Sequence, residues 1–250
     1  MEENEQDEEN LSMSTTTTRS LRDCKVGKRN WGVLIAGVLT IFCLFSVGVL
    51  WGYIFYFYDN ATYSDDPSIH AANILNNSPL IDGHNDLPWE FRRLANDKVV
   101  GGGIDFASNC SEILMTDLPR LRAGGMGCQI WSVYVPCSSS FPVQMTMEQI
   151  DFVHNLVDAY PEDLALVTTA DELETAFRQG KIGSMIGMEG GHSINSSLAV
   201  LRSMYEFGAR YMTLTHSCNT PWADCAQGPF VNQGLSEFGK NVVLEMNRIG

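Results

Sequence analysis

The sequence is short of basic residues. Of its 250 residues, 16 are Lys or Arg and 30 are Asp or Glu, which gives a net charge of −14. No stripe of basic residues of the kind that tracks a phosphate backbone is present. This composition argues against nucleic acid as a partner.

Charge is absent altogether from Trp31 to Tyr58. This run is longer than the ~20 apolar residues that cross a bilayer as a helix. Aromatic residues lie at both of its ends, as they do at membrane interfaces. A buried core helix is the alternative, but an uncharged stretch of this length disfavours it. We therefore expect residues 31–58 to span a membrane.

Basic residues flank this span on one side only. None follows it before Arg92, whereas five precede it: Arg19, Arg22, Lys25, Lys28 and Arg29. The positive-inside rule then places residues 1–30 in the cytosol and the rest of the chain outside. A cleaved signal peptide is the alternative, but its apolar core would have only about 7–15 residues. We expect an uncleaved signal anchor and a single-pass type II protein of the cell membrane.

The chain outside the span divides into three parts. Residues 1–30 carry six acidic residues among the first ten positions, a composition typical of disorder. Residues 59–78 are polar and are expected to form a juxtamembrane linker. Residues 79–250 are expected to fold.

The exterior part carries two marks of a secreted compartment. Glycosylation sequons begin at Asn60, Asn109 and Asn195, and several in one exterior segment fit a glycoprotein. Disulfides persist in that compartment, and five cysteines lie there: Cys110, Cys128, Cys137, Cys218 and Cys225. Because five is odd, at least one is free, bonded to another chain, or bonded to a cysteine outside this sequence.

Strand-like runs alternate with helical periodicity along the exterior part. The expected strands are 79–83, 127–135, 164–167, 181–188 and 210–216, and the expected helices are 88–96, 147–160, 170–179, 197–207 and 236–249. Residues 118–123 are expected to form a short helix or a turn. This order implies a parallel sheet with crossover helices. Without the brief strand 164–167, four main strands remain, which is half of a (β/α)₈ TIM barrel; a whole barrel takes about 250 residues. The fold class is therefore α/β, with about the first half of such a barrel; a small complete α/β domain is the alternative.

Residue types that suit catalysis follow three of these strands, and the C-terminal ends of strands are where barrel active sites are built. His84 and Asp86 are two apart on an extended end, so they share a face and offer ligands for a divalent metal such as zinc. Glu189 could bridge two metal ions, or open the next helix as an N-cap. His216 could be a ligand, a general acid or base, or an oxyanion stabiliser. Together these residues predict a metal-dependent hydrolase.

Four segments resemble the membrane dipeptidase (renal dipeptidase) family of zinc peptidases. They are residues 81–89, 129–134, 189–193 and 214–224. The resemblance implies a (β/α)₈ barrel that binds two zinc ions, forms a homodimer and hydrolyses dipeptides. A zinc-bridged hydroxide would attack the peptide carbonyl.

The resemblance also implies a role for individual residues. His84 and Asp86 would ligate one zinc, and Glu189 would bridge the pair. His216 would bind substrate and stabilise the oxyanion. Cys137 and Cys218 would form an intrachain disulfide.

Other parts of the family's site have no counterpart in this sequence. The two histidines of the second zinc, an acidic proton shuttle and a substrate-binding arginine are expected after residue 250. We therefore expect residues 1–250 alone to be inactive. A non-catalytic surface protein that keeps the fold for binding is the alternative.

Overall fold

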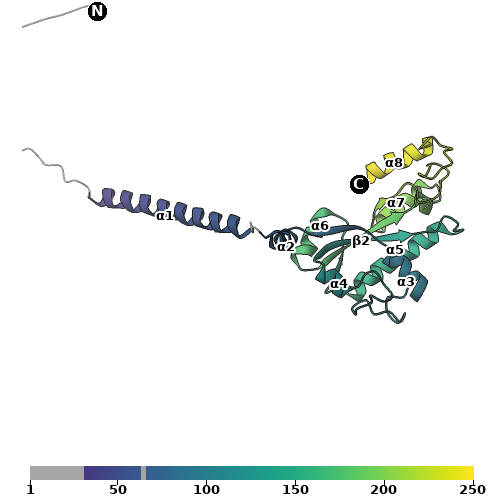
Figure 1. Ribbon diagram of the computed structural model, residues 1–250. Coiled ribbons are helices and arrows are strands. Elements are labelled where there is room, and N and C mark those ends of the chain that lie inside the picture. The colour runs from purple at the N-terminus through teal and green to yellow at the C-terminus, as the bar shows by residue number, and fades with distance from the viewer. Residues whose placement is uncertain (1–30, 63–65) are drawn as a thin grey trace, which may run out of the picture. The chain divides into compact units, whose positions relative to one another are not determined.

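The computed structural model describes residues 31–62 and 66–250, in two units that divide between Ala61 and Thr62. The first unit contains helix α1, Trp31–Thr62 (Figure 1). Within the described residues, α1 is the one helix long and apolar enough to cross a membrane, over Ile35–Tyr56 with a mean hydropathy of 2.2. The predicted tail and the side chain of Asn60 lie outside the described part of the chain.

Helix α2, Pro67–Asn77, occupies much of the segment expected to be a linker. Its start is defined by local chemistry. The carboxylate of Asp66 accepts a hydrogen bond from the backbone N–H of Ser68 at 2.9 Å, and Pro67 opens the helix. No side chain of α2 is buried. The cap, rather than a core contact, therefore accounts for a helix that hydrophobic periodicity did not indicate.

The second unit is built on a five-stranded sheet whose strand pairs are all parallel. The strands are β1 (Leu80–Asn85), β2 (Met126–Tyr134), β3 (Leu164–Leu166), β4 (Ile182–Glu189) and β5 (Ala209–Met212). Their order is β1-β2-β4-β3, and β5 also pairs with β4. β3 pairs with the first half of β4 and β5 with its second half, so the two short strands lie along the same long one.

Helices connect and flank these strands (Figure 1). They are α3 (Leu87–Ala95), α4 (Leu118–Ala123), α5 (Pro142–Ala159), α6 (Ala170–Arg178), the short 3₁₀ helix η1 (Gly191–Ile194), α7 (Leu198–Glu206) and α8 (Glu237–Ile249). The predicted α/β order with parallel strands is confirmed.

Two element boundaries differ by more than two residues from the sequence prediction. Helix α5 begins at Pro142 rather than at residue 147, because a proline fits the first turn of a helix. Strand β5 ends at Met212 rather than at His216. Thr213 still donates its backbone N–H to the Met188 carbonyl at 3.0 Å, and the chain then leaves the sheet. The prediction that His216 ends a strand is therefore wrong: it lies in the following loop.

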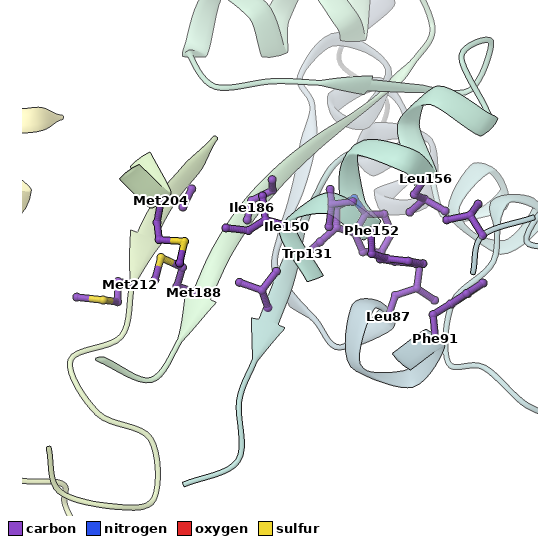
Figure 2. Packing of buried hydrophobic residues seen from close by; sticks show 14 of the residues in the cluster. Leu87, Phe91, Trp131, Ile150, Phe152, Leu156, Ile186, Met188, Met204 and Met212 are labelled. Atoms are coloured by element: carbon purple, nitrogen blue, oxygen red, sulfur yellow. The ribbon is translucent and has the colours of Figure 1, made fainter. Parts of the chain in front are cut away.

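The core forms where helices α3, α5 and α7 pack on one face of the sheet. Figure 2 shows Trp131 of β2 and Ile186 of β4 facing apolar side chains of these helices. The rings of Phe91 and Phe152 lie 5.0 Å apart, and both side chains are fully buried. Each such side chain contributes about 1.5–3 kcal/mol through removal from water. Because side chains alternate along a strand, the residues next to Trp131 point to the other face, where polar groups gather.

Helix α8 is tied to α7 by one carboxylate. Glu245 pairs with Arg202 at 2.9 Å and with Arg248 at 2.7 Å. Hydrogen bonds from Arg248 and Arg202 lower the pKa of Glu245 to about 2. Since the folded pKa lies below the ordinary value of about 4.3, this stabilisation is complete above about pH 4.3 and is lost as the pH falls through about 2.

We therefore expect Glu245→Gln to flatten the acid side of the stability profile. The wild-type thermal midpoint should fall more steeply than that of the variant between about pH 4.3 and pH 2, as followed by circular dichroism. Glu237→Gln is the control, because the ion partner of Glu237 within the described residues is Lys240, which belongs to the same helix. Parallel profiles for the wild type and Glu245→Gln would contradict the assignment.

Candidate active site

The end of β1 and the residue that follows it carry the first two candidate ligands, His84 and Asp86. Between Asp82 and Asn85, β1 advances by three residues while the paired part of β2 advances by two, so the pairing register shifts there. Irregularities of this kind re-aim side chains next to active sites. Asp86 occupies the N-cap position of α3, but its side chain makes no capping bond. Its carboxylate oxygen instead lies 3.3 Å from His84 Nε2.

The last residue of β4, Glu189, lies at the centre of the site. Gly187 is opposite Ser132 of β2 in the register, and Glu189, two residues on, points to the same face. The Ser132 hydroxyl donates to Glu189 Oε2 at 2.9 Å. This carboxylate is the least exposed of the three candidate ligands, at 15%. A neighbouring strand thus fixes its orientation.

Each oxygen of Glu189 faces a different histidine. Oε2 lies 3.4 Å from His84 Nε2, and Oε1 lies 3.4 Å from His216 Nε2. His84 belongs to β1, whereas His216 comes from the loop after β5. Side chains from β1, β4 and the loop after β5 therefore meet at one carboxylate.

The residues present fit a divalent metal ion. Nitrogen and oxygen atoms of His84, Asp86 and Glu189 all lie within 4.8 Å of one another. Tetrahedral zinc, with bonds of about 2.0–2.1 Å, places neighbouring ligand atoms about 3.4 Å apart. The distances from His84 Nε2 to the two carboxylates, 3.3 Å and 3.4 Å, match that spacing. One imidazole and two carboxylates are also a donor set that zinc accepts.

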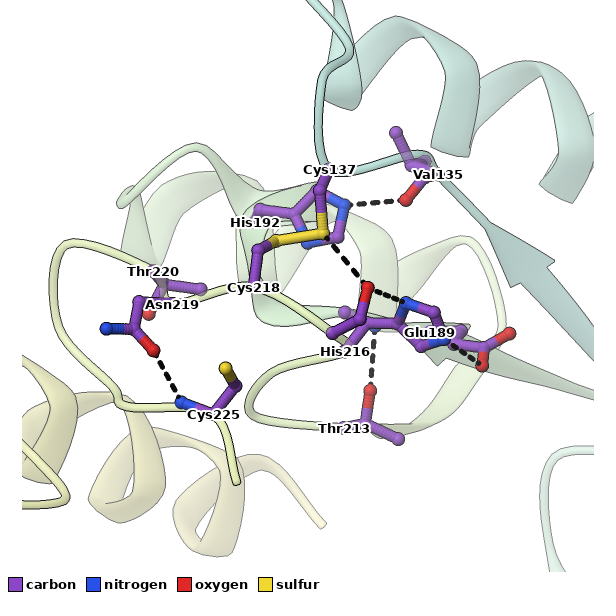
Figure 3. Close-up of a disulfide and its surroundings, with 12 residues drawn as sticks. Val135, Cys137, Glu189, His192, Thr213, His216, Cys218, Asn219, Thr220 and Cys225 are labelled. Carbon is purple, nitrogen blue, oxygen red and sulfur yellow. Dashed lines mark hydrogen bonds and ion pairs between the residues drawn. A yellow bond between two sulfur atoms is a disulfide. The ribbon is translucent and has the colours of Figure 1, made fainter. Parts of the chain in front are cut away.

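A disulfide holds the loop that carries His216. Cys137, after β2, is bonded to Cys218, with their Cα atoms 6.1 Å apart (Figure 3). The predicted Cys137–Cys218 disulfide is thus present. Between Cys218 and His216, the hydroxyl of Ser217 lies 3.1 Å from His216 Nδ1. Both the backbone and the ring of His216 are therefore restrained.

Two hydrogen bonds fix the turn after Glu189. The backbone N–H of Gly190 donates to the Thr213 hydroxyl at 2.7 Å, and His192 Nε2 lies 2.7 Å from the Val135 carbonyl oxygen. Val135 is two residues before the disulfide, as Figure 3 shows. The ends of β2, β4 and β5 are thus cross-linked around the site.

Aromatic side chains that the sequence analysis did not assign form one wall of the site. The ring of Tyr134 lies edge-on to Trp89 at 5.2 Å and to His216 at 5.1 Å. Tyr134 is two residues after Ser132 on β2, so the two share a face. The alternation of Ser132 and Tyr134 with the apolar Trp131 and Val133 is the sequence signal that could have identified Tyr134.

Tyr211 of β5 also reaches the site, across β4. Its hydroxyl donates to the Gly83 carbonyl at 3.1 Å, and its ring lies against Gly187, where a Cβ atom would have no room. Burial and the negative charges of Glu189, Asp86 and Asp82 raise the pKa of Tyr211. The phenol therefore stays protonated and remains a donor at neutral pH. No pattern in the sequence pointed to this residue.

The other predicted modification sites lie away from this centre. Asn109 and Asn195 are exposed. Three further cysteines are buried free thiols: Cys110, Cys128 and Cys225. Burial raises the pKa of Cys128 to about 12, which makes that thiol unreactive.

Comparison with known proteins identifies relatives of this chain. A model of the membrane dipeptidase family (peptidase family M19) matches residues 69–250. Dipeptidase 3 of Rattus norvegicus is 45% identical over 195 residues, which are 74% of this chain and 38% of that protein. Dipeptidase 3 of Mus musculus is 44% identical over the same shares. The chain thus spans less than half the length of the curated relatives it matches.

Solved structures resemble the fold. A metallopeptidase from Rhodobacter sphaeroides, bound to a phosphinate mimic of the dipeptide L-Ala-D-Ala, has a TM-score of 0.55 at 20% identity; the match covers 68% of this chain and 56% of that one. The probable dipeptidase PvdM from Pseudomonas aeruginosa has a TM-score of 0.58 at 17% identity; the match covers 72% of this chain and 47% of that one. The family model matches more than half of the residues of this chain, and the chain therefore belongs to the membrane dipeptidase family.

Proposed function

We propose that the protein is a membrane-anchored zinc dipeptidase whose metal ligands include His84, Asp86 and Glu189. The observation that carries this proposal is the Glu189 carboxylate, which has a histidine 3.4 Å from each oxygen and Asp86 within reach of the same ion. A second zinc would share Glu189 with histidines that the family resemblance places after residue 250. A homodimer is a further expectation from the resemblance.

His216 is proposed to bind the substrate and to stabilise the oxyanion. A bound zinc pair would supply hydroxide at neutral pH and polarise the peptide carbonyl. The Ser217 hydroxyl, by donating to Nδ1, would place the ring proton of His216 on Nε2, the atom that faces Glu189. An N–H held at that point is positioned for an oxygen that becomes negative as the carbonyl is attacked.

The proposed substrates are dipeptides. Trp89 and Tyr134 offer an aromatic wall beside His216 on which an apolar side chain of the substrate could pack. The similarity to a peptidase that binds a phosphinate mimic of a dipeptide supports this class, because a phosphinate has the tetrahedral shape of attacked carbonyl carbon.

Hydrolysis measured with the protein expressed from its complete coding sequence tests the proposal. We expect cleavage of glycyl dipeptides, weaker cleavage of the matching tripeptides, loss of activity with a chelator and recovery with zinc. A dipeptide phosphinate should inhibit the hydrolysis by competing with the substrate. A purified, folded protein that binds zinc but cleaves no dipeptide would favour the non-catalytic alternative.

The proposed anchor is α1, with residues 66–250 outside the cell. It is supported by the apolar span Ile35–Tyr56 and by the basic residues that precede it. Tags at the two ends of the chain test this topology by protease protection in intact cells. We expect the C-terminal tag to be digested and the N-terminal tag to be protected.

Ser132 is expected to support the metal site without touching the ion. Its hydroxyl holds Glu189 Oε2 at 2.9 Å, so Ser132→Ala should weaken zinc binding about 10–100-fold, as loss of a supporting contact usually does. Competition with a chromogenic chelator measures the affinity. Ser138→Ala, at an exposed position after the same strand, is the control. Equal zinc affinity in the two variants would contradict the role of Ser132.

A further inference from the structure

An apolar groove lies outside the candidate active site, between the start of α5 and the turn after η1. It has a volume of about 580 Å³, and its lining includes Phe141, Val143, Met147 and Asn195. Phe141 is 68% exposed and Met147 is 43% exposed. These side chains leave apolar surface uncovered at the start of α5, and another group can pack on it.

Asn195 lies on the rim of this groove and begins a glycosylation sequon that ends at Ser197. The residue is exposed and adopts a left-handed conformation, with φ 46° and ψ 44°, as the C-cap of η1. Within the described residues, its side-chain amide makes no hydrogen bond. The amide nitrogen is therefore accessible on a surface turn, next to uncovered apolar side chains.

We propose that Asn195 carries an N-linked glycan whose first N-acetylglucosamine lies in this groove. The inference rests on the proposed placement of residues 66–250 outside the cell. In the modification, the Asn195 amide nitrogen loses a proton and bonds to the anomeric carbon of a polyprenyl-diphosphate-linked oligosaccharide, which releases the polyprenyl diphosphate.

The chemistry of the groove suits this sugar. N-acetylglucosamine has an apolar face of C–H groups and an acetyl methyl, which would pack on Phe141 and Met147. Its hydroxyl groups would face two polar residues of the lining, Gln144 and Glu148, which are already hydrogen bonded to each other at 2.7 Å. The glycan would thus cover the apolar surface at the start of α5, which follows the loop of Cys137.

Occupancy is tested first. The protein from its complete coding sequence, with an added sequon tag at its C-terminus, is expressed in mammalian cells and deglycosylated enzymatically in ¹⁸O water. We expect mass spectrometry to find Asn195 converted to ¹⁸O-labelled Asp. A modified tag with unmodified Asn195 would overturn the inference and leave the exterior placement standing. An unmodified tag would overturn both.

Coverage of the groove is tested by methionine oxidation. Met147 lies in the groove, whereas Met115 is 91% exposed elsewhere and is the internal control. Peroxide should oxidise Met147 several-fold more slowly in the glycosylated protein than in Asn195→Asp, with Met115 unchanged. Asp tolerates the left-handed conformation and is the product of enzymatic deglycosylation, so this variant keeps the turn. If Asn195 is glycosylated but Met147 is oxidised at the same rate in the glycosylated protein and in Asn195→Asp, the glycan points away from the groove. That result would overturn the proposed packing of the sugar in the groove.

Discussion

Glu189→Gln is expected to abolish dipeptide hydrolysis and to release zinc from the protein expressed from its complete coding sequence. The amide keeps the shape of the side chain but removes the negative charge that faces His84 and His216. It also replaces one oxygen by an NH₂ group, which cannot ligate a metal. The zinc affinity should fall by more than the factor of about 10–100 that loss of a supporting contact causes. Metal content by mass spectrometry and kcat/KM for a glycyl dipeptide measure the two effects.

Two matched variants isolate the cause. Glu162→Gln makes the same chemical change at an exposed position and should leave zinc content and activity unchanged. His84→Ala should reproduce the loss of zinc, because it removes the imidazole nearest both carboxylates. If Glu189→Gln kept both zinc and activity while folding normally, Glu189 could not be a bridging ligand and the proposed metal centre would be wrong.

The elements that the sequence predicted well are those defined by local chemistry. Helix α6 starts at the predicted residue, Ala170, and follows the N-cap Thr169, whose side chain forms a reciprocal capping box with Glu172. Helix α4, Leu118–Ala123, coincides with the segment for which a short helix or a turn was expected. Caps and periodicity act within a few residues, so a sequence displays them directly.

The features that the sequence did not reveal depend on contacts between distant segments. The register shift after Asp82 depends on the pairing of β1 with β2, and β5 ends where its pairing with β4 ends. Ser132 and Tyr211 reach the site only because β2, β4 and β5 are neighbours in register. The candidate ligands could be predicted from the sequence residue by residue. The groups that support them could be identified only from the fold.

Breaking the disulfide is expected to reduce both stability and turnover. The bond closes a sequence separation of 81 residues. In the chain-entropy model, a loop of this length stabilises the folded state by about 4–5 kcal/mol, which corresponds to roughly 10 °C or more in the thermal midpoint of a domain this size. Cys218→Ser should show this shift in thermal unfolding under oxidising conditions. Reduction of the wild type should reproduce it.

Turnover should fall because the disulfide restrains His216, two residues from Cys218. The rest of the loop keeps its own bonds: Asn219 Oδ1 accepts from the Cys225 N–H at 2.8 Å, and Asp224 accepts from the Asn232 N–H at 2.8 Å. Cys218→Ser should therefore leave a folded protein with a loose His216 and a lower kcat. Cys137→Ser and the double variant should match it, because each removes the same bond. A lower kcat in Cys218→Ser alone would show that the Cys218 side chain, rather than the cross-link, positions His216.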